Sequence, residues 1–212
     1  MCAVRAERNP LPPTFHSAMS SAVSESIAAV VREYRRTADV SALLAALDRI
    51  ARESETAALM AAVAPHRDLH EVCGPVYEVI VEREPTNATA LVALANAYWL
   101  TGRGPEVVAG LADRARSADP TNRAAWHLWA LAESSPRERT SRWRVVTQEF
   151  PDDELAQVNL ADNAAALAGA ENDPVALKLA LATYETLLAR ATRGDQRAAL
   201  ERAVTTLRNW RG

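Results

Sequence analysis

The stretch EPTNATALVALANAYWLTGRGPEVVAGLADRARSADPTN, residues 84–122, decides the fold of this chain. It begins and ends on the same signal, because Pro85-Thr86-Asn87 returns as Pro120-Thr121-Asn122. Between the two signals, Gly102-Arg103-Gly104 separates two segments whose apolar residues recur at helical spacing. The stretch therefore predicts two helices, over residues 88–101 and 105–117, joined by a short glycine turn.

A third, looser copy of the signal follows as Phe150-Pro151-Asp152-Asp153. The copies predict a second helix pair over residues 123–133 and 136–149, and a third over 153–168 and 174–192. Asp173-Pro174 is a helix cap followed by a first-turn proline, which is a typical helix start. A period near 34 residues with two helices in each unit is the signature of a tetratricopeptide array.

The unit at 84–118 resembles a tetratricopeptide repeat residue by residue. The family places a bulky residue one turn into the first helix, where this chain has Leu91, and then a large-small pair, here Leu94-Ala95. An aromatic residue and a glycine turn follow in the family, matched by Tyr98 and Gly102. The resemblance is clearest over 85–120 and weakens afterwards, with Glu133 at the aromatic position of the second unit and Gln157 at the bulky position of the third.

The resemblance implies an all-α chain, a right-handed superhelical stack of about ten or eleven helices in antiparallel pairs. We divide the sequence into a disordered leader at 1–18, N-terminal helices at 19–84 that form one or two degenerate pairs, repeats at 85–192, and a capping helix at 193–212. A two-helix unit cannot bury its apolar face alone, which is the physical reason for stacking.

The N-terminal helices are predicted from caps and prolines. We expect helices starting at Ser20 or Ser21, near Ser41, at Ser54 (ending at Pro65) and at Asp68. Pro75 lies inside the fourth pattern and predicts a kink or a late helix start, because proline lacks a backbone donor. The leader contains no secretory signal, and either Met1 or Met19 could be the true start.

Composition excludes several classes of function. Apolar residues make up 49% of the chain, so a disordered chain is not expected. The net charge of -3 argues against a nucleic-acid binder that relies on bulk positive charge. No apolar run approaches the roughly 20 residues that span a bilayer. We therefore expect a cytoplasmic protein with no membrane or nucleic-acid partner.

Three residues have spacing that could suit a metal. His66, His70 and Cys73 are separated by four and three positions and could share a helix face. The alternative places His66 in a loop after Pro65 and Cys73 in the core, and no second ligand pair follows elsewhere. We therefore expect no metal and no cofactor, with these three residues as weak candidates.

Two charged clusters have structural explanations. Asp152, Asp153 and Glu154 open a helix, where its dipole stabilises negative charge. The basic run of Arg137, Arg139, Arg142 and Arg144 around Trp143 could contact phosphate, but a solvated helix face explains it better. No nucleophile-base-acid arrangement and no nucleotide-binding loop is visible in the sequence.

The resemblance implies a groove lined by the first helix of each pair. The groove-facing candidates are Thr89, Val92, Asn96, Trp99, Ala124, His127, Leu131, Leu155, Val158 and Asp162. Trp99 and His127 are the most interesting of these. Tryptophan supplies large contact area at binding hot spots, although Trp99 could instead fill a gap between pairs. The clamp for a terminal carboxylate that some members carry is not expected, because Val92 and Leu155 stand where the family has basic residues.

The sequence thus favours a non-catalytic scaffold or adaptor that binds a protein or peptide in this groove. A regulatory peptide sensor remains an alternative, as does an enzyme or metal-binding protein built on a helical scaffold. An array end that exposes apolar surface could also form a homodimer.

Overall fold

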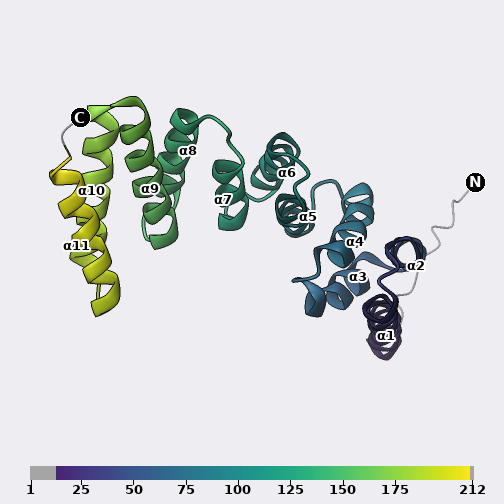
Figure 1. The fold of residues 1–212 in the computed structure, drawn as a ribbon. Helices are drawn as coiled ribbons and strands as arrows, with labels where there is room; N and C mark the ends of the chain where they lie inside the picture. The colour runs from purple at the N-terminus through teal and green to yellow at the C-terminus, as the bar shows by residue number, and fades with distance from the viewer. Residues whose placement is uncertain (1–12, 211–212) are drawn as a thin grey trace, which may run out of the picture. The chain divides into compact units, whose positions relative to one another are not determined.

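The computed structural model describes residues 13–210, and all regular structure in this range is helical (Figure 1). The range contains eleven α-helices and one short 3₁₀ helix, η1. The helices are α1 (Pro13–Thr37), α2 (Val40–Glu53), α3 (Thr56–Val63), η1 (Ala64–His66), α4 (His70–Arg83), α5 (Ala88–Thr101), α6 (Pro105–Ala118), α7 (Arg123–Leu131), α8 (Pro136–Glu149), α9 (Glu154–Glu171), α10 (Pro174–Arg190) and α11 (Gly194–Arg208). The predicted all-α class is confirmed.

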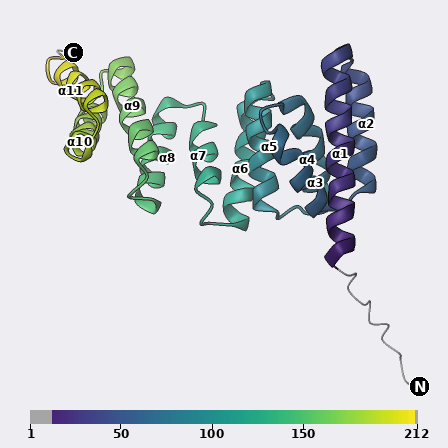
Figure 2. The same cartoon turned by 90° about the horizontal axis from the view of Figure 1, so that it is seen from below.

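The chain divides into two compact units, Met1–Ala97 and Tyr98–Gly212, with the boundary inside α5. In the first unit α1 packs against α2 and α3, α2 packs against α4, and α3 packs against α4. Figure 2 shows α1 and α2 side by side. The first helices of the two pairs, α1 and α3, thus pack on each other, and so do the second helices, α2 and α4. This is the packing of two stacked pairs, which supports the helix pairs proposed for 19–84. The right-handed coiling of the whole array stays a prediction.

The core of the first unit comes from the inward faces of these four helices. Its fully or almost fully buried aliphatic residues are Ile27, Val31, Leu43, Leu47, Leu59, Val63, Val72, Val76 and Ile80. They recur at helical spacing within each element, so each helix buries one stripe. Each such side chain contributes about 1.5–3 kcal/mol when removed from water.

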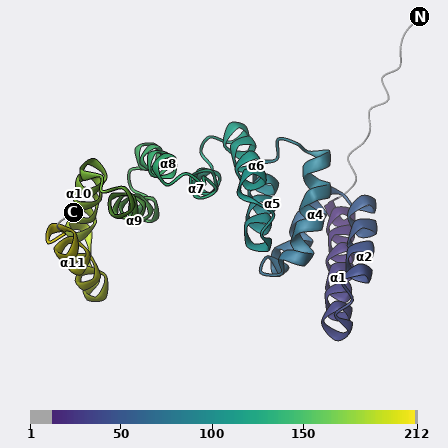
Figure 3. The same ribbon diagram turned by 45° about the horizontal axis from the view of Figure 1, so that its top comes forward.

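In the second unit each helix from α6 to α11 packs against the next one. One core cluster joins α7, α8 and α9 through Trp126, Ala130, Trp143, Val146, Ala156 and Leu160. Figures 1 and 3 both show α11 lying alongside α10. Leu200 and Val204 of α11 are buried, whereas Arg197 and Arg202 are more accessible, which supports the proposal that 193–212 cap the array.

The repeated signal forms three equivalent corner turns. The side-chain oxygens of Asn87, Asn122 and Asp153 each accept the backbone N–H three residues later, at 3.0, 3.3 and 3.2 Å. The N–H groups of the same three residues donate to the carbonyl three residues earlier, at 3.0, 3.1 and 3.0 Å. Each corner therefore ends one helix and caps the next, because a helix start leaves backbone N–H groups unpaired.

The bulky position after each corner is also equivalent across the three copies. Leu91, Trp126 and Gln157 are all largely buried there. Trp126 Nε1 donates to the Pro120 carbonyl at 2.8 Å, and Gln157 Nε2 donates to the Pro151 carbonyl at 2.6 Å. Gln157 departs from the family in residue type, yet it takes the place of Trp126 and makes the corresponding bond to its corner.

The glycine turn between α5 and α6 has the predicted position. Gly102 and Gly104 have φ of 73° and 95°, in the left-handed region that side-chain-bearing residues rarely adopt. A Cβ at Gly104 would also lie 3.0 Å from Glu106 Oε1. The second pair uses a different device, in which the Ser135 side chain accepts the N–H of Glu138 at 3.4 Å.

Several N-terminal boundaries differ from those predicted. α1 begins at Pro13, not at Ser20 or Ser21, because proline suits the first helical turn and nothing after it interrupts the helix. Residues 13–18 of the predicted leader are therefore helical, and residues 1–12 lie outside the described range. α2 is capped by Asp39, whose side chain accepts the Ala42 N–H at 2.9 Å.

The predicted starts of α3 and α4 were also wrong. α3 is preceded by Glu55 at its N-cap, where no side chain makes a capping bond, so the prediction of a Ser54 cap fails. α4 begins at His70, after Asp68, and runs through Pro75 without a later start. Pro75 is the sixth residue of α4, so the Glu71 carbonyl loses its helical N–H donor there, but the helix continues past it.

The corner turns predict a measurable cost for losing a cap. Asn122→Ala should lower the free energy of unfolding by about 1 kcal/mol, because the Ala125 N–H loses its acceptor. Urea unfolding followed by tryptophan fluorescence checks this, since Trp126 and Trp129 lie on the helix that is capped. Ser141→Ala, at an exposed position within α8, is the control and should change stability by less than about 0.5 kcal/mol. Equal effects of the two variants would contradict the role of the corner.

Candidate functional site

The candidate groove residues on α5 belong to both units. In the first unit Thr89 and Asn96 are exposed, and Val92 is half-buried. Trp99, in the second unit, exposes 39% of its surface, and its neighbour Leu100 exposes 56%. Trp99 is therefore not enclosed within a core, and a role in binding stays a prediction.

His127 on α7 contacts the start of α9. Its Nε2 lies 2.7 Å from Oδ2 of Asp153, a distance at which the ring N–H donates to the carboxylate. Asp153 is buried and caps α9, and the Arg123 guanidinium lies 3.6 Å from the same oxygen. The ring also packs edge-on to Trp143, with 5.3 Å between centroids. His127 thus has a structural role that its predicted position in the groove did not indicate.

The remaining candidates on α7 and α9 form two short stripes. We define the α7/α9 stripe as Ala124, His127 and Leu131 on α7 with Leu155, Val158 and Asp162 on α9. Leu155 exposes 59% of its surface, whereas Leu131 and Val158 are half-buried. Both helices pack on one core cluster, so the stripes belong to a single unit.

Asp162 is tied to the neighbouring helix. The Tyr184 hydroxyl of α10 donates to Asp162 Oδ1 at 2.5 Å. Burial and then this hydrogen bond raise the pKa of Tyr184 above its ordinary value, so the hydroxyl stays protonated and keeps donating. Asp162 is exposed but already has a partner, and Tyr184 was not identified from the sequence because it lies 22 residues away.

A stack of tryptophan and arginine side chains joins α6, α7 and α8. The Arg116 guanidinium lies 4.5 Å from the Trp126 ring centroid and 4.3 Å from that of Trp129. Arg142 lies 4.8 Å from the Trp129 centroid on α7 and pairs with Glu133 at 2.6 Å. Sequence reasoning did not identify Arg116, although two tryptophans three residues apart on one helix face were visible. Cation–π contacts of this kind stabilise by about 0.5–2 kcal/mol each.

The basic run on α8 is largely used within the fold. Arg137 pairs with Glu171 and Asp173, and this pairing raises the pKa of its guanidinium. Arg139 Nε donates to Asn163 at 2.8 Å, while Arg142 Nη1 donates to the Trp129 carbonyl at 2.9 Å. Trp143, which follows Arg142, is buried. Three of the four arginines of this run are thus engaged by the fold itself, which disfavours a phosphate-binding patch.

The weak metal candidates do not form a site. His66 lies in η1, whereas His70 begins α4, so the three residues do not share one helix. Cys73 is buried and its thiol donates to the His66 carbonyl at 3.0 Å. Burial, and then the nearby Asp68 and Glu71 carboxylates, raise the pKa of the Cys73 thiol to about 11. Across residues 13–210, no group of three or more His, Cys, Asp or Glu side chains is arranged to hold a metal ion.

The clamp for a terminal carboxylate finds no support in the geometry either. Asn159 on α9 is a polar residue that could contact such a carboxylate, but its side-chain amide donates to the Leu155 carbonyl of its own helix at 2.8 Å. Within the part of the chain that the structure describes, no helix is long and apolar enough to cross a membrane.

Comparison with known proteins rests on structure, since no family model and no curated protein matches this sequence. The fold is similar to the crystal structure of a thermophilic TPR protein from Thermus thermophilus, with a TM-score of 0.53 and 17% sequence identity. The match covers 86% of this chain and 99% of that one. The chain therefore has the fold of an α-helical repeat protein. More narrowly, that fold is tetratricopeptide-like, and the resemblance drawn from residues 84–118 is confirmed at this level.

The contact between His127 and Asp153 predicts energetic coupling. Asp153→Asn keeps an oxygen that can cap α9 but removes the charge, and His127→Ala removes the ring. A double-mutant cycle in urea at neutral pH should give a coupling energy of about 1 kcal/mol or more, because the Asp153 carboxylate is buried. The same cycle with Arg123→Ala, whose side chain is mostly exposed, should give less than about 0.5 kcal/mol. Additive effects for His127 and Asp153 would show that the contact does not stabilise the fold.

The environment of Cys73 predicts that its thiol reacts slowly with thiol reagents. In a Cys2→Ser background, Cys73 should react with Ellman's reagent at pH 8 far more slowly than a free cysteine, because only the thiolate attacks. A thiol whose folded pKa is raised favours the native state below its unfolded pKa, and that contribution is lost as the pH rises from about 9 to about 11. Reaction rates in urea should rise with the unfolded fraction. A native rate equal to that of the unfolded chain would contradict this prediction.

Proposed function

We propose that this protein is a non-catalytic scaffold that binds a segment of another protein on the α7/α9 stripe. The observation that carries the proposal is the 59% exposure of Leu155, flanked by the half-buried Val158 on its own helix. The apolar surface of a leucine exposed in the first turn of a helix is removed from water only when a partner covers it, and this removal favours binding. Half-buried apolar side chains around an exposed one are suited to a short amphipathic or extended segment.

The polar residues beside this apolar surface support binding without catalysis. His127 and Asp162 are both held by partners within the fold, the first by Asp153 and the second by Tyr184. Such groups present fixed donors and acceptors to a ligand, which favours recognition of shape and hydrogen-bonding pattern. The engaged arginines of α8 support a protein partner over nucleic acid.

A peptide selection with matched variants tests the proposal. The full chain is immobilised and used to select phage-displayed random peptides about a dozen residues long, which suffices for helix-in-groove or extended binding. An enriched peptide is then titrated by calorimetry against the parent protein and Leu155→Asp. The variant should bind about tenfold more weakly, equivalent to about 1.4 kcal/mol.

Val175→Asp provides the matched control, because Val175 exposes 76% of its surface on α10, outside the stripe. It should leave the affinity within about twofold, as expected for a position that the ligand does not touch. Circular dichroism of both variants verifies that the helices are retained. If the enriched peptides bind Leu155→Asp as tightly as the parent, or if none is enriched, the stripe is not the binding surface.

A further inference from the structure

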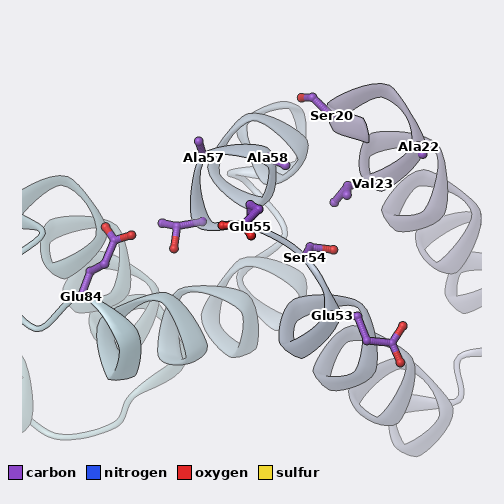
Figure 4. Close-up of a pocket in the computed structure, with 10 residues that line it drawn as sticks. Ser20, Ala22, Val23, Glu53, Ser54, Glu55, Ala57, Ala58 and Glu84 are labelled. Carbon is purple, nitrogen blue, oxygen red and sulfur yellow. The ribbon is translucent and has the colours of Figure 1, made fainter. Parts of the chain in front are cut away.

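A hollow of about 770 Å³ opens in the first unit beside α1 (Figure 4). The helices of the first pair differ in length around it. α1 has 25 residues, whereas its neighbour α2 has 14, so α1 extends past the end of α2 and leaves a ledge. The volume falls in the range of roughly 300–1,000 Å³ that ligand pockets commonly have. None of its lining residues belongs to the α7/α9 stripe.

The wall of the hollow is made of small apolar side chains. Its apolar lining comes from Ala22 and Val23 of α1 and from Ala57 and Ala58 of α3. Figure 4 shows Val23 lying between the α1 and α3 ribbons. Small residues leave room there, and their methyl groups provide an apolar surface for an aliphatic stem.

Three carboxylates from different elements border this apolar wall. Glu53 ends α2, Glu55 precedes α3 and Glu84 follows α4, and all three are exposed. Figure 4 shows Glu84 at one side, Glu53 at the other and Glu55 between them. Among residues 13–210, the side chains of Glu53 and Glu55 make no ion pair or hydrogen bond. Hydrogen bonds from Asn87 and then Thr56 lower the pKa of Glu84, which keeps it charged.

Neither Arg83 nor Arg52 makes an ion pair with these three carboxylates. Arg83 donates from Nη1 to the Ser54 carbonyl and from Nη2 to the Arg52 carbonyl, both at 2.7 Å, so its guanidinium is used on the backbone of the corner. Arg52 itself pairs with Asp48 at 2.8 Å. The corner is thereby held in place while its carboxylates stay available to a ligand.

We propose that this hollow binds a segment of a partner protein through an arginine or lysine side chain. The aliphatic stem lies against Val23, Ala57 and Ala58, and the cationic head pairs with Glu53 and Glu55. Long basic side chains combine an apolar stem with a charged head, which matches a surface that is apolar within and acidic at its border. Anionic ligands such as phosphates are repelled by the same three carboxylates.

Fluorescence anisotropy with three labelled probes tests the proposal on the full chain. The probes are decapeptides of alternating alanine with arginine, glutamine or glutamate. The arginine peptide should bind, and its affinity should fall as salt is added, because the contact is between charges. The glutamine and glutamate peptides should bind at least about fivefold more weakly, as expected for two lost surface ion pairs. Equal binding of all three would overturn the proposal.

Two sets of variants locate the binding. Glu53→Gln combined with Glu55→Gln should weaken the arginine peptide about fivefold, for the same loss of two ion pairs. Glu25→Gln combined with Glu33→Gln removes the same charge from exposed positions of α1 outside the hollow and should leave the affinity nearly unchanged. Ala57→Arg places a positively charged side chain of the protein itself at the hollow and should also lower the affinity for the arginine peptide. Equal loss in both double variants would show attraction by net charge alone and would refute the site.

A second copy of the chain is the competing occupant. Sedimentation at increasing protein concentration should show that the parent chain does not self-associate through the hollow. Any self-association should therefore be unchanged in the Glu53→Gln, Glu55→Gln double variant. If self-association is found that the double variant abolishes, the hollow is an interface between copies and the proposal fails. The α7/α9 stripe is untouched by every variant used here, so its own peptide selection succeeds or fails independently.

Discussion

Each corner of the array depends on a single asparagine or aspartate that accepts a backbone N–H at the start of a helix. Asn87, Asn122 and Asp153 do this with nearly the same geometry, and the backbone of each donates back to the preceding turn. The corner therefore sets both the end of one helix and the start of the next. Side chains that follow at a constant interval then face the core in every copy, which is why the bulky residue after each corner is buried alike.

Features that depend on neighbours in sequence could be predicted, and these corners are the clearest case. A cap acts over three residues and a glycine turn over two, so Pro85-Thr86-Asn87 and Gly102 were sufficient to place α5 and α6. The start of α1 was missed because serine is only one of several residues that can begin a helix, and Pro13 does so as well. The start of α3 was missed because its N-cap, Glu55, makes no side-chain bond that a sequence pattern could reveal.

Contacts between distant residues could not be predicted in the same way. His127 and Asp153 are 26 residues apart, and each had a satisfactory local explanation, one as a groove residue and the other as a cap. Their contact depends on how α7 and α9 pack on the shared core, which helical spacing alone does not specify. The stack of Arg116 on Trp126 and Trp129 is similar, because it requires the crossing of α6 and α7. The two bonds of Arg83 are another such contact, since its planar guanidinium donates at once to the carbonyls of Arg52 and Ser54, about 30 residues earlier in the chain.

The two proposed binding surfaces differ in whether their charged side chains already have partners within the fold. On the α7/α9 stripe the polar side chains of His127 and Asp162 already have partners in the fold, so a ligand gains most from covering Leu155 and its apolar neighbours. In the hollow of the first unit, the carboxylates of Glu53 and Glu55 make no ion pair with another described residue, so both can pair with a ligand. Binding to the stripe then depends mainly on apolar area and little on salt, whereas binding to the hollow depends on ion pairs that salt screens. Ionic strength therefore distinguishes the two surfaces even before either partner is identified.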